Sequence, residues 1–293
     1  SILLFLTAIL AALIANSSLS PIYQDFLLQE LHLRVGNFNL LSHGGHPLKM
    51  IEFINDCLMT VFFLAVGLEI KRELLVGELS SFRKAALPFV AACGGMVVPV
   101  LIYSLLVISG TPETRGMAIP MATDIAFSLG VLSLLGKRVP LSLKIFLTAF
   151  AVVDDIGGIL VIALFYSTDV AYGYLIVAAI LYIFLYYMGK LGVTQKIFFL
   201  FFGIIIWYLF LQSGIHSTIS GVILAFVIPA RPRLDAGKYI KRIRDIIGEF
   251  PASKSDNIVL TNAQIATLKQ VERASDHVIS PLQSLEDNLH GAV

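Results

Sequence analysis

Two adjacent carboxylates interrupt an apolar stretch of the sequence, "FAVVDDIGGIL", in which Asp154 and Asp155 are the only charged residues. An ionised carboxylate at the bilayer centre costs about 2.5 to 3.5 kcal/mol on insertion scales, so the pair opposes insertion by roughly 5 to 7 kcal/mol. A pair at a helix end, or one neutralised by a lysine, would have a structural role only. We favour a functional pair with one side chain facing an ion and the other a neighbouring helix, because adjacent helix positions point about 100° apart. The spacing leaves open which one faces the ion.

A third carboxylate, Asp124, lies in "GMAIPMATDIAFSLG" beside the hydroxyl of Thr123. Pro120 removes a backbone donor there, and Gly116 and Gly130 weaken the helix further, so a broken or unwound segment is predicted. Transporters use broken spans to present helix ends and free carbonyls to ions. For Thr123, a hydrogen bond to its own helix is an equally simple explanation.

Oxygen atoms dominate this set of candidates, which suits a hard cation such as sodium or lithium and not zinc or copper. The two cysteines, Cys57 and Cys93, stand in different apolar runs and indicate neither a disulfide nor a metal site. Two neighbouring carboxylates repel each other, so the same oxygens can hold either protons or a cation. Cation binding then expels protons and protons expel the cation, which is an exchange mechanism that needs no organic cofactor.

Further polar residues lie near the ends of apolar runs. Asp56 and Glu69 bracket the second run, where a solvated helix end explains them as well as a role in ion entry or pH response does. His216 stands beside Gly214 and Ser217, a position that favours a packed or capping histidine.

Eight apolar runs position these residues. With 57% hydrophobic and 14% charged residues, the chain departs far from the soluble average of about 25% charged. The runs cover 2–15, 53–70, 85–108, 116–135, 141–166, 171–188, 197–212 and 215–229. The sequence therefore predicts an all-α polytopic membrane protein with about eight transmembrane helices, and a net charge of +1 gives no reason to expect a nucleic-acid partner.

The distribution of Lys and Arg predicts the orientation of these helices. Basic residues gather after the second, fourth, sixth and eighth runs and are sparse in the other connections. The positive-inside rule places those connections, and the amino terminus, in the cytoplasm. Only Ser213 and Gly214 separate the last two runs, so we expect an antiparallel pair or a re-entrant hairpin.

From residue 231 onward the composition resembles that of a soluble protein, which divides the chain into a transmembrane region (1–230) and a cytoplasmic basic, amphipathic linker (231–293). Thr261 and Gln264 fit a capping box, and Pro281 should kink or divide the helix that follows. We favour a linker lying on the membrane or on its own protein over a partner-binding module.

Four stretches together resemble the NhaA-type sodium/proton antiporters of bacterial inner membranes. They are "NDCLMTVFFLAVGLEIKREL", "GMAIPMATDIAFSLGVL", "LKIFLTAFAVVDDIGGILVIALFY" and "SGIHSTISGVI". The resemblance runs through the chain in order, and it implies an inverted-repeat fold with discontinuous helices. It also implies export of cytoplasmic sodium or lithium in exchange for external protons, by alternating access under control of internal pH.

The resemblance assigns roles to individual residues. Asp154 and Asp155 become the cation- and proton-binding pair, with Asp155 the principal ligand. Asp124 would compensate the opposed helix dipoles at a crossing of broken helices, and Thr123 would assist binding. The residues implied in the cytoplasmic funnel and the pH response are Glu69, Arg72, Glu73, Glu286 and His290, although Asp287 stands where the family pattern has a histidine.

The resemblance also implies about four further helices after Val293, with a second broken helix and an intramembrane lysine. We therefore expect the 293-residue chain to be a fragment that is not transport-competent alone. A passive cation channel or structural membrane subunit is the alternative, and an intramembrane aspartyl protease is a remote one because no G-x-G-D signature is present. Besides the lipid bilayer, the expected partners are the transported ions, and a homodimer is an arrangement that the sequence allows.

Overall fold

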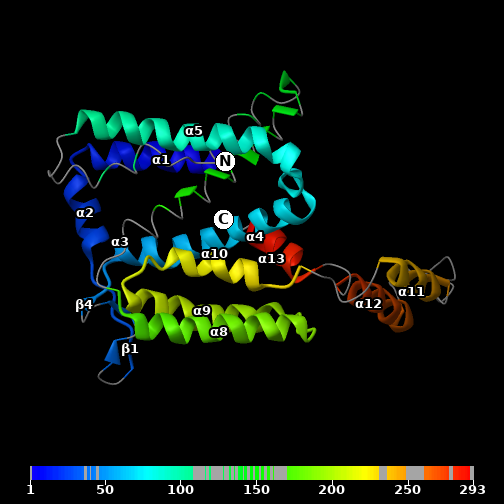
Figure 1. Ribbon diagram of the computed structural model, residues 1–293. Helices are drawn as coiled ribbons and strands as arrows, with labels where there is room; N and C mark the ends of the chain where they lie inside the picture. Colours follow the sequence, from blue (N-terminus) through cyan, green and yellow to red (C-terminus); the bar gives the residue numbers. More distant parts are fainter. Residues whose placement is uncertain are drawn as a thin grey trace.

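The computed structural model describes residues 2–35, 38–39, 41–43, 46–107, 170–230, 236–248, 261–276 and 280–290, with scattered positions between 116 and 161 (Figure 1). The fourth and fifth predicted helices (116–135 and 141–166) therefore lie largely outside the described residues. The number of eight helices and the inverted repeat stay predictions.

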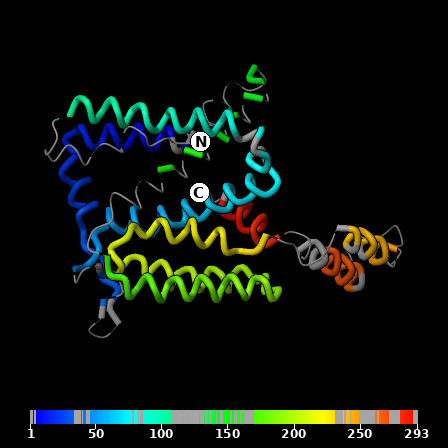
Figure 2. The backbone as a smooth tube through the Cα atoms, viewed as in Figure 1, coloured from blue at the N-terminus to red at the C-terminus, as the bar shows by residue number. Residues whose placement is uncertain are grey.

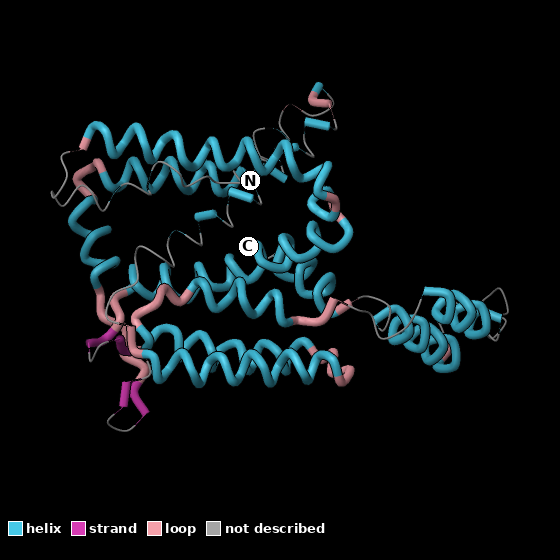
Figure 3. Tube along the Cα trace, viewed as in Figure 1, coloured by secondary structure: helices cyan, strands magenta, loops and turns pink. Residues whose placement is uncertain are grey.

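The described part of the chain is mostly helical, as the sequence predicts (Figure 3). The first half contains α1 (Ile2–Ala15), α2 (Ser20–Leu28), α3 (Met50–Phe53), a π-turn (Ile54–Leu58), α4 (Met59–Val76), a 3-10 turn (Glu78–Ser80) and α5 (Phe82–Leu106). The second half contains α8 (Tyr172–Lys190), α9 (Lys196–Ser213), α10 (Thr218–Val227), α11 (Ala236–Gly248), α12 (Asn262–Asp276) and α13 (Pro281–His290). Two small antiparallel strand pairs, β1 (Arg34–Val35) with β2 (Phe38–Asn39) and β3 (Ser42–His43) with β4 (His46–Pro47), connect α2 to α3.

Helices α4, α8, α9 and α10 pack into one bundle, and α1 and α5 run above it in the view of Figure 1. The sequence of α9 is apolar at almost every position, which is typical of a helix surrounded by other helices or by lipid. The core of the bundle is a cluster of buried apolar side chains that includes Leu64, Leu68, Leu185, Phe199, Ile206, Leu224 and Ile228. The bundle therefore joins α4 to three consecutive helices that begin about 100 residues further along the chain.

Small residues make the contact between α4 and α10 close. A Cβ atom added to Gly67 would come within 2.8 Å of the Ala225 Cβ, and one added to Gly221 would come within 2.5 Å of the Thr60 carbonyl oxygen. Gly221 and Ala225 are four residues apart on one face of α10, a pattern that lets two helix backbones approach each other in a membrane. This close contact holds Thr60 of α4 against α10.

Four described helices are long and apolar enough to cross a membrane: Met50–Val76, Ala86–Leu106, Tyr172–Lys190 and Lys196–Ser213. They coincide with the second, third, sixth and seventh predicted runs. A fifth span is counted if α1 and α2, which meet at an angle of 108°, cross together. The prediction of a spanning length for the eighth run (215–229) is wrong, since α10 has ten residues. The chain turns over residues 214–217 and leaves the helix before Pro229, a residue that disfavours helix in the position before it.

The connection between α9 and α10 is a tight turn at Gly214, whose φ of +79° lies in the left-handed region that glycine adopts without strain. In Figure 1, α9 and α10 run in opposite directions on the two sides of this turn, as both an antiparallel pair and a re-entrant hairpin require. In Figure 1 the end of α4, the start of α5, the α8–α9 connection and the end of α10 lie at the same end of the molecule. These connections are rich in Lys and Arg, so the basic segments share one end, which we call the basic end.

The three helices after residue 231 differ in what they contact. The capping box is confirmed, because Gln264 N–H donates to the Thr261 hydroxyl at 3.3 Å and Thr261 N–H donates to Gln264 Oε1 at 2.9 Å. Pro281 divides the segment as predicted, since α12 ends at Asp276 and α13 begins at Pro281. Helix α13 packs on α4, whereas α11 and α12 pack on each other (Figure 2).

Candidate functional site

The Asp154 side chain is buried, with 4% of its surface exposed, in a segment whose neighbouring Ala149, Ala151 and Val153 are also buried. A buried carboxylate among apolar residues is the environment that the sequence predicts for it. Asp155, Asp124 and Thr123 lie outside the described residues, so their positions relative to Asp154 stay predictions.

Helix α5 is the described neighbour of the Asp154 segment. A Cβ atom on Gly95 would meet the Phe150 ring at 3.4 Å, and one on Gly157 would collide with the Met96 side chain. Gly157 therefore faces α5 and lies against the Met96 side chain. At Gly158, no described atom lies within 4 Å of an added Cβ.

An ion-pair cluster lies at the basic end of α4. Arg72 Nη1 is 2.8 Å from Glu286 Oε1 on α13, and Arg72 Nη2 is 3.3 Å from Glu73 Oε1. The two glutamates are each 14% exposed, so the guanidinium lies between two largely buried carboxylates. Glu69 is half-buried one helical turn before Glu73. The structure therefore brings together Arg72, Glu73 and Glu286, three of the five residues that the resemblance assigns to the pH response, and their role in it stays a prediction.

Helix α13 is held at this position by more than the ion pair. Leu282 and Leu285 are buried in the same apolar cluster as Leu68, and Lys196 Nζ at the start of α9 donates to Ser284 Oγ at 2.6 Å. His290 lies at the end of α13, and its side chain is outside the described residues. Helix α13 thus connects α4 and α9 at the basic end.

Lys71 makes a contact that the sequence does not indicate. Its Nζ donates to the backbone carbonyls of Phe226 at 2.7 Å, of Ala225 at 3.3 Å and of Ile228. Phe226 and Ala225 belong to the last turn of α10 and Ile228 directly follows it, at the end where the helix leaves acceptors unpaired and carries a partial negative charge. Lys71 therefore caps α10 from α4, and the two helices are fixed at the basic end.

A second polar network lies at the opposite end of α4, around the π-turn that contains Asp56. The Asp56 carbonyl accepts hydrogen bonds from Thr60 Oγ1 at 2.6 Å, Trp207 Nε1 at 2.6 Å and Ser217 Oγ at 2.9 Å. The Asp56 side-chain Oδ1 lies 2.8 Å from Ser217 Oγ and 3.5 Å from His216 Nδ1. Asp56 thus connects α4, α9 and the start of α10. The sequence marks Asp56 and His216 as separate polar residues, and nothing in their spacing pairs them.

Among the described residues, no group of three or more His, Cys, Asp or Glu side chains is placed so that it could hold a metal ion. Long apolar helices, the buried carboxylate of Asp154 and polar networks at the two ends of α4 together define a multi-pass helical membrane protein.

The comparisons with known proteins identify the family. A family model described as Na+/H+ antiporter 1 matches residues 1–293. A Bacteroides thetaiotaomicron protein named Na(+)/H(+) antiporter NhaA is 75% identical over 293 residues, which are 100% of this chain and 67% of that protein. Proteins of the same name from Bacteroides fragilis and Phocaeicola vulgatus are 76% and 61% identical, and the chain covers 67% and 65% of their lengths. The chain belongs to this family of sodium/proton antiporters, and it spans about two thirds of the length of these relatives.

Proposed function

We propose that the protein exports cytoplasmic sodium or lithium in exchange for external protons, as a secondary active transporter driven by the proton gradient. The observation that carries this proposal is the buried carboxylate of Asp154, in an apolar segment of a chain from a sodium/proton antiporter family. The names of the relatives favour antiport over a passive channel and over an intramembrane protease.

Asp154 and Asp155 form the exchange site in this proposal, with Asp155 as the principal cation ligand. In a water-poor site two adjacent carboxylates are stabilised either by a cation or by protons, so each ligand displaces the other. Asp124 compensates the helix dipoles at the broken segment, and Thr123 offers a further oxygen. Alternating access would expose this site first to one side of the membrane and then to the other.

The pH response in this proposal belongs to the cluster of Glu69, Arg72, Glu73, Glu286 and His290. Support comes from the position of Arg72, which bridges a carboxylate on α4 and a carboxylate on α13. A change in the charge of either carboxylate would weaken the attachment of α13 to α4. Since α4 also contacts α10 closely, such a change can be transmitted along the bundle.

The location that we propose is the bacterial inner membrane, with the amino terminus and the basic end in the cytoplasm. Support comes from the shared end of the Lys- and Arg-rich connections, because basic residues are retained on the cytoplasmic side.

The test of the site is the substitution Asp155→Asn in the full-length protein, measured in everted membrane vesicles. Vesicles with the unchanged protein should release accumulated protons when sodium or lithium is added, and Asp155→Asn should abolish this release. Asp25→Asn is the matched control, because Asp25 is exposed on α2 and outside the proposed site. Normal exchange with unchanged sodium affinity in Asp155→Asn would contradict the site assignment.

A further inference from the structure

Helices α11 and α12 form a pair that lies to the side of the bundle in Figure 1, and the proposed function uses neither of them. Helix α11 alternates apolar and basic residues in "AGKYIKRIRDIIG" so that isoleucines gather on one face and charges on the other. Such a pattern is typical of helices that lie at an interface between apolar and aqueous surroundings.

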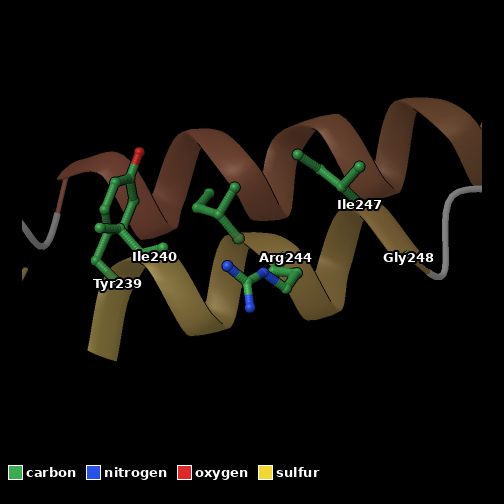
Figure 4. Close-up of a pocket in the computed structure, with 6 residues that line it drawn as sticks. Tyr239, Ile240, Arg244, Ile247 and Gly248 are labelled. Atoms are coloured by element: carbon green, nitrogen blue, oxygen red, sulfur yellow. The ribbon is translucent and has the colours of Figure 1, made fainter. Parts of the chain in front are cut away.

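Part of the apolar face of α11 has no cover in the described structure. Ile243 and Ile246 are half-buried, whereas Ile240 and Ile247 are 57% and 59% exposed. Arg244 lies between these two exposed residues, and all three line an open hollow of about 510 Å³ along the helix (Figure 4). Positions i, i+4 and i+7 share one edge of a helix, so apolar and basic groups alternate along this edge.

Helix α12 has an exposed apolar edge of its own. Ile265 and Leu268, three residues apart, are 37% and 46% exposed. The pairing of α11 with α12 therefore buries only a part of the apolar surface of either helix.

The positive charge of the protein is concentrated in and just before α11. Residues 231–248 contain six Lys or Arg and two Asp, a net charge of +4, whereas the whole chain carries +1, which leaves −3 for all other residues. An acidic surface is the complement of this segment. The cytoplasmic leaflet of a membrane supplies one through its anionic lipids, which attract basic segments close to a membrane span.

The connection to the bundle keeps α11 near the membrane. Only residues 228–235 separate the end of α10 from the start of α11, and a chain of this length reaches at most about 30 Å. The basic helix is therefore confined to the neighbourhood of the end of α10, where the surface of the bilayer lies in the proposed orientation.

We propose that α11 is a membrane-surface helix that binds anionic lipid. Ile240 and Ile247 enter the boundary between headgroups and acyl chains, while Lys241 and Arg244 contact the lipid phosphates through their long side chains. The proposal does not depend on the identity of the transported ion. A second copy of the chain, or another segment of the same protein, would cover the isoleucines without any requirement for anionic lipid.

The test uses the full-length protein, without native cysteines, in vesicles of phosphatidylcholine with or without phosphatidylglycerol. A single cysteine at Ile247→Cys carries an environment-sensitive fluorophore, and Asp245→Cys, exposed on the opposite side of α11, is the matched control. In anionic vesicles the fluorescence emission of the probe at position 247 should be shifted to the blue relative to neutral vesicles. Spin-labelled lipid should quench this probe at least twofold more than the probe at position 245. Lys241→Gln together with Arg244→Gln should remove this difference.

Two results would overturn the proposal. Equal quenching of both probes in anionic vesicles would show that α11 does not place this edge in the lipid. If the emission of the probe at 247 is equally blue-shifted in detergent, in neutral vesicles and in anionic vesicles, protein and not lipid covers this edge of α11.

Discussion

The close contact between α4 and α10 predicts that Gly221→Ala destabilises the protein. An added Cβ would lie 2.5 Å from the Thr60 carbonyl oxygen, 3.1 Å from the Leu64 nitrogen and 3.2 Å from Thr60 Cγ2. Two of these atoms belong to the α4 backbone, so no side-chain rotation relieves the clash. The helices must instead separate by about 0.5 to 1 Å, a gap that forfeits a quarter to a half of the contact attraction.

The magnitude follows from a matched substitution. Inserting a methyl group into a well-packed contact costs about 1 to 3 kcal/mol. Alanine also favours a helix over glycine by about 1 kcal/mol, which would mask part of this loss. Gly94→Ala in α5 gains the same helix propensity, and no described atom lies within 4 Å of its added Cβ. The difference between the two variants therefore isolates the clash, at about 1 to 3 kcal/mol.

The assay is thermal unfolding of the full-length protein in detergent, followed by intrinsic fluorescence. Gly221→Ala should unfold a few degrees below Gly94→Ala, since 1 kcal/mol shifts the midpoint by about 2 to 4 °C for 150 to 250 residues and by less for a longer chain. Equal midpoints for the two variants would refute the inference that backbone contact at Gly221 holds α10 on α4.

Two further substitutions test the contacts at the basic end. Lys71→Met removes the donor to three carbonyls of α10 and should lower the free energy of unfolding by about 1.5 to 3 kcal/mol, whereas Arg83→Met at an exposed position should change it little. Denaturant unfolding measures both, and equal losses would contradict the capping role. Glu286→Gln weakens the ion pair with Arg72, at a cost of about 1 kcal/mol, and should raise amide hydrogen exchange in α13 by about fivefold. Asp287→Asn, exposed on the same helix, is its control, and unchanged exchange in Glu286→Gln would show that the pair does not hold α13.

Helices and their ends could be predicted from the sequence because local chemistry determines them. Apolar runs locate α4, α5, α8 and α9, and Gly214, Pro281 and the Thr261 capping box mark turns and boundaries that the structure confirms. The length of α10 could not be predicted in this way. Its run is apolar over a spanning length, but the turn that precedes it and the proline that follows it shorten the helix.

The partners of the polar residues could not be predicted. Helices in a membrane are apolar on most sides, so their pattern does not say which face meets which neighbour. Lys71 and its carbonyl partners are more than 150 residues apart, and so are Asp56 and Ser217. For the candidate site, the burial of Asp154 follows from its apolar surroundings in the sequence, whereas the position of Asp155 and the partners of both carboxylates depend on helix packing.

The central claim is that the aspartate pair exchanges protons for a cation, and proton release on cation binding measures it most directly. Purified full-length protein in weakly buffered detergent should release protons when sodium or lithium chloride is added, but not when choline chloride is added at equal ionic strength. Asp155→Asn should lose this release, while Asp25→Asn should keep it. Release of the same size from Asp155→Asn, or no release from the unchanged protein, would contradict the claim.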